Sequence, residues 1–184
     1  NRKLFLNGGS GDPTDSSTNP SLDVFYRFTP SLNGALTINT DFSATEVDAR
    51  QVNLTRFPLF FPEKRDFFLE GTDIFDFGIG LDLVVVPFHS RRIGLIGGQE
   101  VPILAGVKTT GRAGDTSFGG LAVRTREATG LPPAQSLGSV RVKQNVLRES
   151  WVGFIGTAGD PLGRPGSWLS GVDLVYQTSR FRGD

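Results

Sequence analysis

The C-terminal part of the chain, from residue 101 onward, alternates between apolar and polar side chains with a period of two. In 101–112 the odd positions include Val101, Ile103 and Val107, whereas Lys108 and Arg112 occupy even positions. A period of two is the signature of a β-strand with one apolar and one polar face. Four further stretches follow the same rule, at 117–127, 137–144, 151–158 and 167–179. We therefore expect five antiparallel strands in meander order.

The connections between these strands are expected to alternate in length. Short turns fall at 113–116 and 145–150, and longer loops with Gly and Pro fall at 127–136 and 159–167. Outer-membrane barrels combine short periplasmic turns and longer outer loops with a polar lumen and an apolar band facing lipid. The pattern thus predicts an all-β antiparallel meander that forms part of a transmembrane outer-membrane β-barrel. It leaves open a soluble sandwich or barrel whose charged face meets water.

The two faces of the expected strands assign side chains to lumen and lipid. Basic residues expected to line the lumen are Lys108, Arg112, Arg124, Arg126, Arg141 and Lys143. Aliphatic residues expected to face lipid are Val101, Ile103, Val107, Leu121, Val123, Val140, Val142, Ile155, Val172 and Leu174. Residues expected at an aromatic girdle are Trp151, Trp168 and Tyr176. On this assignment Val123→Arg impairs membrane assembly by about 2–4 kcal/mol, and Arg124→Val is milder.

The rest of the chain divides into a strand-like start and an irregular middle. Strands are expected at 22–28 and 34–43, and 2–6 reads as a truncated strand. In 44–100 no period persists, although 81–88 reads as a buried strand. We expect one barrel domain over 1–184, or the N-terminal portion of a longer barrel. It comprises first strands at 1–43, a plug or cap segment at 44–100 and the meander at 101–184.

The stretch 56–71 in this middle segment mixes five phenylalanines with six charged residues. Irregular backbone of this kind needs shelter from lipid, inside the barrel or at one of its mouths. We expect its charged residues to form an ion network that holds the plug, made of Glu63, Lys64, Arg65, Asp66 and Glu70. Between 41 and 100 there are ten acidic and six basic residues, against six and ten between 101 and 184. The basic row therefore either favours anionic solutes in a conduit or balances the acidic middle.

Composition excludes several classes of site. The chain has no Cys, one His and no net charge. Disulfides, zinc-thiolate sites and thiol catalysis are excluded, and nucleic-acid binding is not indicated. No run of 18 apolar residues exists, so the sequence holds no membrane-spanning helix.

Several acidic residues and the one histidine are candidates for catalysis or metal binding. Glu63 and Glu70 could act as a glycosidase pair, but a local ion network that holds the loop in place is the favoured interpretation. His89 lacks a nucleophile motif and reads as structural. Possible calcium ligands are Asp12, Asp15 and Asn19, and also Asp73, Asp76 and Asp82, but solvated loop explains both sets. We assign no catalytic residue, metal or cofactor.

Four segments carry a family resemblance: 36–71, SRRIGL (90–95), VPILAGVKTTGR (101–112) and GVDLVYQTSRFRGD (171–184). Together they resemble the uncharacterised barrel domain that follows a family-9-type carbohydrate-binding module in Gram-negative envelope proteins. The resemblance implies an outer-membrane barrel, with the sugar-binding module upstream and further strands downstream. It carries no functional residues over to this chain, and His89 departs from the aromatic expected there.

The expected function is that of a non-enzymatic barrel segment in the bacterial outer membrane. It would serve transport, or anchor a carbohydrate-binding module at the surface. Its expected partners are membrane lipid, carbohydrate through the upstream module and other envelope proteins, but not nucleic acid. The alternative is a soluble β-sandwich that binds or hydrolyses glycans.

Overall fold

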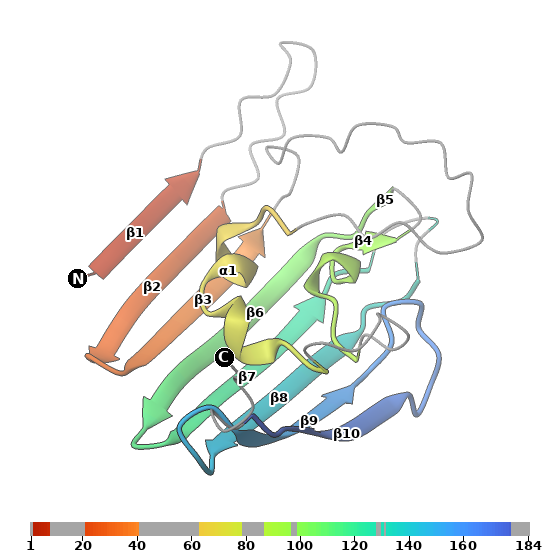
Figure 1. The fold of residues 1–184 in the computed structure, drawn as a ribbon. Helices are drawn as coiled ribbons and strands as arrows, with labels where there is room; N and C mark the ends of the chain where they lie inside the picture. Colours follow the sequence, from red (N-terminus) through yellow and green to blue (C-terminus); the bar gives the residue numbers. More distant parts are fainter. Residues whose placement is uncertain are drawn as a thin grey trace, which may run out of the picture.

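The computed structural model describes residues 2–7, 21–40, 63–78, 87–96, 99–127, 130 and 132–177. Its main element is one eight-stranded sheet in the order β1-β2-β3-β6-β7-β8-β9-β10, with every neighbouring pair antiparallel (Figure 1). The strands are β1 Arg2–Asn7, β2 Ser21–Thr29, β3 Leu32–Thr40, β6 Ile103–Ala113, β7 Thr116–Thr125, β8 Ser136–Asn145, β9 Trp151–Ala158 and β10 Trp168–Val175. The all-β antiparallel meander is confirmed. Within the described residues the sheet is open, with β1 and β10 at its edges.

The connections of the sheet alternate in length, as the sequence predicts. The short turns are 30–31, 114–115 and 146–150, and the longer connections include 126–135 and 159–167. In the two-residue turn between β6 and β7, Gly114 has φ +58°, a left-handed conformation that favours glycine. Because the strands form a meander, the short turns lie at one end of the sheet and the long loops at the other. We call these the turn end and the loop end.

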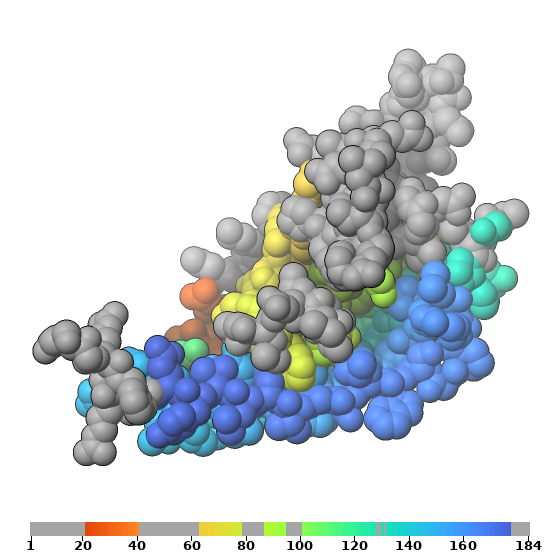
Figure 2. Space-filling model, turned by 45° about the vertical axis from the view of Figure 1, so that its right-hand side comes forward, coloured from red at the N-terminus to blue at the C-terminus, as the bar shows by residue number. Residues whose placement is uncertain are grey.

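One face of the sheet is covered by residues 63–78 and 87–96, which we call the cover. It contains the short helix α1 Asp66–Leu69, the 3₁₀ turns η1 Thr72–Phe75 and η2 Ser90–Arg92, and β4 Leu95–Ile96, which pairs with β5 Gln99–Glu100. Figures 1 and 2 show the cover lying against the sheet. Pro87 and Phe88 are not in a strand, and the rest of the strand expected at 81–88 lies outside the described residues. None of the helices in the described ranges has the length and apolar character needed to cross a membrane.

The core lies between the cover and this covered face of the sheet. It consists of Phe67, Phe68, Phe75 and Ile93 from the cover, packed on Ala35, Ile103, Leu121, Val123 and Leu137. Glycines in the strands allow the aromatic rings to approach the backbone. A Cβ on Gly106 would lie 3.1 Å from the Phe67 ring, and one on Gly119 would lie 3.0 Å from the Phe75 ring. The phenylalanines of the middle segment therefore have a packing role against glycine-lined strands.

The opposite face of the sheet, which we call the outward face, is apolar and exposed. Side chains on it that are at least 40% exposed include Tyr26, Phe28, Leu36, Ile38, Val107, Val140, Val142, Phe154, Trp168, Val172 and Leu174. Many are cross-strand neighbours: Leu36 pairs with Val107, and Phe154 pairs with both Val142 and Val172. Among the outward positions of β2, β3 and β6 to β10, the one charged residue is Arg124, at the loop end.

Candidate functional site

A buried ion pair joins two strands beneath the cover. Arg141 of β8 is fully buried and donates two hydrogen bonds to Asp173 of β10, from Nη1 to Oδ1 (2.6 Å) and from Nη2 to Oδ2 (2.8 Å). Between them lies Gly153 of β9, where a Cβ would be 2.5 Å from Asp173 Oδ1. The backbone N–H of Gly78 in the cover also donates to Asp173 Oδ2 (3.1 Å). The pair therefore connects β8 and β10 to the cover, through the space that Gly153 leaves on β9.

A second charged cluster organises the cover itself. Arg65 Nε and Nη2 donate to the two carboxylate oxygens of Glu63, each at 2.7 Å. The same guanidinium donates to the carbonyls of Ser90 (2.8 Å) and Ile93 (2.5 Å), and the Ser90 hydroxyl donates to Glu63 Oε2 (2.7 Å). Arg65 also lies 4.1 Å from the centroid of the Phe68 ring. This cluster therefore joins the two segments of the cover, 63–78 and 87–96.

The electrostatics of this cluster hold Glu63 in its ionised form. Burial by itself would raise the pKa of Glu63, but the hydrogen bonds and positive charge of Arg65, with the hydroxyl of Ser90, lower it to about 2. A carboxylate with this pKa is a poor general acid at neutral pH. Of the two carboxylates considered as a glycosidase pair, Glu63 is thus committed to Arg65 and Ser90.

Glu63→Gln is expected to destabilise the cover by about 1.5–3 kcal/mol at neutral pH, because it removes a charged acceptor from Arg65. A depressed carboxylate pKa gives stability that is present above the unfolded value of 4.5 and is lost as pH falls toward about 2. The difference in stability between wild type and variant should therefore shrink as the pH falls from 4.5 toward about 2. Hydrogen exchange of 63–69 as a function of pH measures it. Glu149→Gln, an exposed glutamate in the 146–150 turn, is the control, and an equal effect there would contradict the assignment.

The other residues of the expected ion network, Lys64, Asp66 and Glu70, have separate roles. Glu70 accepts, through its backbone carbonyl, a hydrogen bond from Nζ of Lys108 on β6 (2.5 Å), and Lys108 lies 5.5 Å from the Phe67 ring centroid. The backbone N–H of Lys64 donates to Glu63 Oε1 (3.1 Å), and Asp66 is exposed in the first turn of α1. Lys108 thus fixes the backbone at the end of α1.

The six basic residues expected in a lumen do not share one environment. Lys108 and Arg141 are buried beneath the cover, and Lys143 is half-buried, 4.9 Å from the Trp151 ring centroid. The other three are exposed: Arg112 Nε donates to Ser117 (3.2 Å), Arg124 Nη1 to Ser136 (2.8 Å) and Arg126 Nη2 to Asn39 (2.5 Å). Arg124 lies on the outward face, opposite to the side expected.

The aliphatic residues expected to face lipid also divide between the two faces. On the outward face are Val107, Val140, Val142, Val172 and Leu174. Buried on the covered side are Val101, Ile103, Leu121, Val123 and Ile155. The register explains the difference, because Leu121 pairs with Lys108 and therefore shares its face. The expectation that Val123→Arg reports on lipid contact was wrong, since Val123 packs in the core.

The aromatic residues expected at a girdle divide in the same way. Trp168 and Tyr176 are strongly exposed, Trp168 on the outward face at the loop end and Tyr176 just beyond β10. Trp151 instead lies on the covered face, 5.5 Å from the Arg141 guanidinium. Sequence reasoning missed other aromatic residues at the turn end: Tyr26 and Phe28 meet edge-to-face at 4.9 Å on the outward face.

The metal candidates are only partly within the described residues. Asp12, Asp15, Asn19 and Asp82 lie outside them. Asp73 and Asp76 are described, and burial raises the pKa of Asp76, with Lys143 opposing the shift and Asp73 adding to it. In the described parts of the chain, no group of three or more acidic or histidine side chains could hold a metal ion.

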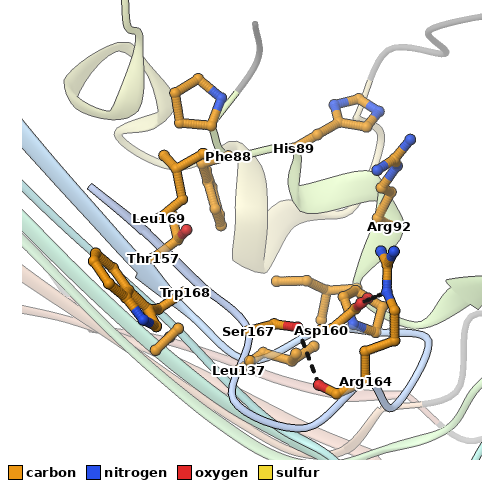
Figure 3. Close-up of a pocket in the computed structure, with 16 residues that line it drawn as sticks. Phe88, His89, Arg92, Leu137, Thr157, Asp160, Arg164, Ser167, Trp168 and Leu169 are labelled. Carbon is orange, nitrogen blue, oxygen red and sulfur yellow. Dashed lines mark hydrogen bonds and ion pairs between the residues drawn. The ribbon is translucent and has the colours of Figure 1, made fainter. Parts of the chain in front are cut away.

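A pocket lies at the loop end, between the cover and the covered face (Figure 3). It has a volume of 480 Å³, within the range typical of small-molecule sites. Phe88 and Ile93 of the cover and Leu137 and Leu169 of the sheet give it apolar walls, and polar groups come from His89, Arg92, Thr157, Asp160, Arg164 and Ser167. The sequence contained no periodic signal for it, because its lining comes from the cover, the sheet and the 159–167 loop, which are distant from one another in the chain.

The model of a domain of unknown function, DUF5916, matches residues 4–108, which is more than half of the chain. The chain belongs to the DUF5916 family. This confirms the coarser part of the resemblance, a domain family without assigned activity. Searches of curated proteins and of solved structures found no match.

The DUF5916 match covers a defined part of the fold. Residues 4–108 include most of β1, all of β2 and β3, the cover, and β6 as far as Lys108. The Glu63–Arg65 cluster and the Lys108 contact with the backbone of Glu70 therefore lie within the family domain. Arg141, Asp173 and the 159–167 side of the pocket lie beyond the matched residues.

Proposed function

We propose that this DUF5916 chain is a non-enzymatic segment of an outer-membrane β-barrel. In this proposal the outward face contacts lipid and the cover fills part of the interior. The observation that carries it is the inverted distribution of polarity across the sheet. The outward face exposes a band of aliphatic and aromatic side chains, whereas the covered face buries Lys108, Arg141 and Asp173. A soluble sheet that has one wet face places its charged residues on that face.

Strand length and aromatic placement support the same proposal. A strand that crosses a bilayer needs about 9–11 residues. β2 and β3 have nine residues, β6 eleven, and β7 and β8 ten, whereas β9 and β10 have eight. Tyr26 and Phe28 at the turn end and Trp168 at the loop end occupy positions where interfacial aromatic residues gather. Apolar patches of this extent are otherwise rare on monomeric soluble proteins.

The physiological role follows from the resemblance noted in the sequence. We propose transport, or surface anchoring linked to a carbohydrate-binding module, in the bacterial outer membrane. Lipid is then the main partner, with carbohydrate and other envelope proteins as further ones. Because the cover occupies the covered face through Phe67, Phe68 and Phe75, any solute path must pass beside the cover or require it to move.

The two tryptophans offer a direct test of lipid contact. The chain has only Trp151 and Trp168, so Trp151→Phe and Trp168→Phe each leave one fluorophore. In vesicles with bromine on the acyl chains, Trp168 is expected to be quenched several-fold more than Trp151, because Trp168 lies on the outward face. Equal quenching of the two tryptophans would contradict the proposal that the outward face contacts lipid. Recovery of the folded chain in the aqueous fraction without detergent would favour the soluble glycan-binding alternative.

A further inference from the structure

We propose that the loop-end pocket binds a small organic carboxylate that has an apolar body. The inference stands on the pocket alone and does not require the membrane assignment. It assigns a ligand class to a cavity formed jointly by the cover, the sheet and the 159–167 loop.

The polar wall of the pocket holds more hydrogen-bond donors than acceptors. Asp160 is buried, and its carboxylate accepts from the N–H of Leu162 (2.9 Å) and from Arg164 Nε. Arg164 remains largely exposed, with a side chain 73% accessible, so its terminal N–H groups face the pocket and solvent. Arg92 is also exposed, and no hydrogen bond or ion pair of its guanidinium occurs among the described residues.

The local charges leave a net positive wall. Burial would raise the pKa of Asp160, but the N–H of Leu162 and the charges of Arg164 and Arg92 lower it, so this carboxylate stays ionised. Burial and the nearby Arg92 lower the pKa of His89, which is therefore neutral at pH 7. Asp160 carries one negative charge against the two arginines, and Figure 3 shows Arg92, Asp160 and Arg164 together on one side of the pocket. An anionic group of a ligand would complement the remaining positive charge.

The shape of the pocket defines the rest of the ligand. Phe88, Thr157 and Leu169 lie across from the arginines in Figure 3, and Leu137 and Ile93 complete the apolar surface. Guanidinium groups bind carboxylates through paired, charge-assisted hydrogen bonds. A bare inorganic anion would leave the apolar surface unused, and a neutral apolar molecule would leave the arginine unpaired. A carboxylate on an aromatic or aliphatic body matches both parts.

His89 provides the readout, because it is the only histidine in the chain. The experiment uses the full chain, without a histidine tag, in a nonionic detergent, with isotope-labelled histidine observed by NMR. The probes are 4-phenylbutyrate, the neutral 4-phenyl-1-butanol and acetate. We expect 4-phenylbutyrate to bind at least tenfold more tightly than either of the others. Its bound carboxylate should also raise the pKa of His89.

Arg92→Gln is expected to weaken 4-phenylbutyrate binding about tenfold, because one charge-assisted contact is lost. Arg148→Gln, in the 146–150 turn at the other end of the sheet, is the matched control and should leave binding unchanged. The His89 spectrum of each free variant verifies that the pocket is folded. Equal affinity for acid and alcohol, equal binding by Arg92→Gln and wild type, or no response of His89 would each overturn the proposal.

Discussion

Val140→Arg is expected to prevent insertion of the sheet into lipid bilayers. Val140 lies near the middle of β8 on the outward face, and its cross-strand neighbours are Gly120 and Gly156. Neither glycine offers a polar side chain that could pair with a guanidinium. A charged residue at the bilayer midplane of a β-barrel costs about 2–4 kcal/mol. Since small domains have only about 5–15 kcal/mol of stability, this is a large fraction of the total.

The measurement is folding into phosphatidylcholine vesicles across a urea titration. Folding can be followed by the migration difference between heated and unheated samples. Val140→Arg should move the midpoint to lower urea or abolish folding. In a soluble protein the same change would be nearly neutral, because the valine is already half-exposed and an arginine would meet water.

Val146→Arg is the matched control. Val146 is 55% exposed and Val140 is 51% exposed, so the two valines differ little in accessibility. Val146 lies in the 146–150 turn, beyond the end of β8, where a charge can reach water or the headgroup region. Tolerance at position 146 with loss at 140 supports lipid contact. Tolerance at both positions would mean that the outward face is not in a bilayer.

The sequence was sufficient to locate the strands but not to orient all of them. Alternation is a local property, and all five strands expected after residue 100 lie where it predicts them. Which face of a strand is covered depends on the strand with which it pairs. Arg141 shares the covered face with Ile155, and Lys108 shares it with Leu121, because cross-strand partners lie on one face. β7 has apolar side chains at both odd and even positions, so its alternation alone could not show which of its faces is covered.

The cover was harder to predict because its contacts are distant in the chain. Arg65 bonds the carbonyl of Ser90, and Gly78 bonds Asp173 on the last strand. No periodicity in 63–78 indicates either partner. The mixture of phenylalanine and charge in this segment is explained only by the surface it meets. Glycines of β6 and β7 accept the rings, and carbonyls from η2 and its C-terminal neighbour accept the guanidinium.

Asp173→Asn is expected to cause the largest loss of stability within the covered region, about 3–5 kcal/mol, because it removes the carboxylate that pairs with the buried Arg141. The side chain of Arg141 has no exposed surface, and its Nε has no hydrogen-bond partner among the described residues, so solvent does not compensate for the lost carboxylate. The same change weakens the hydrogen bond from Gly78 and should loosen the cover. Urea unfolding measures the loss, and hydrogen exchange at 76–78 measures the loosening.

Two further variants separate the ion pair from a general effect of mutation. Asp115→Asn, in the exposed turn between β6 and β7, makes the same chemical change and should shift stability by less than about 0.5 kcal/mol. Arg141→Met combined with Asp173→Leu removes both charges and should recover much of the loss, because an apolar pair has no desolvation cost. If the double variant is as unstable as Asp173→Asn, then the space around Gly153, and not the unpaired charge, limits stability.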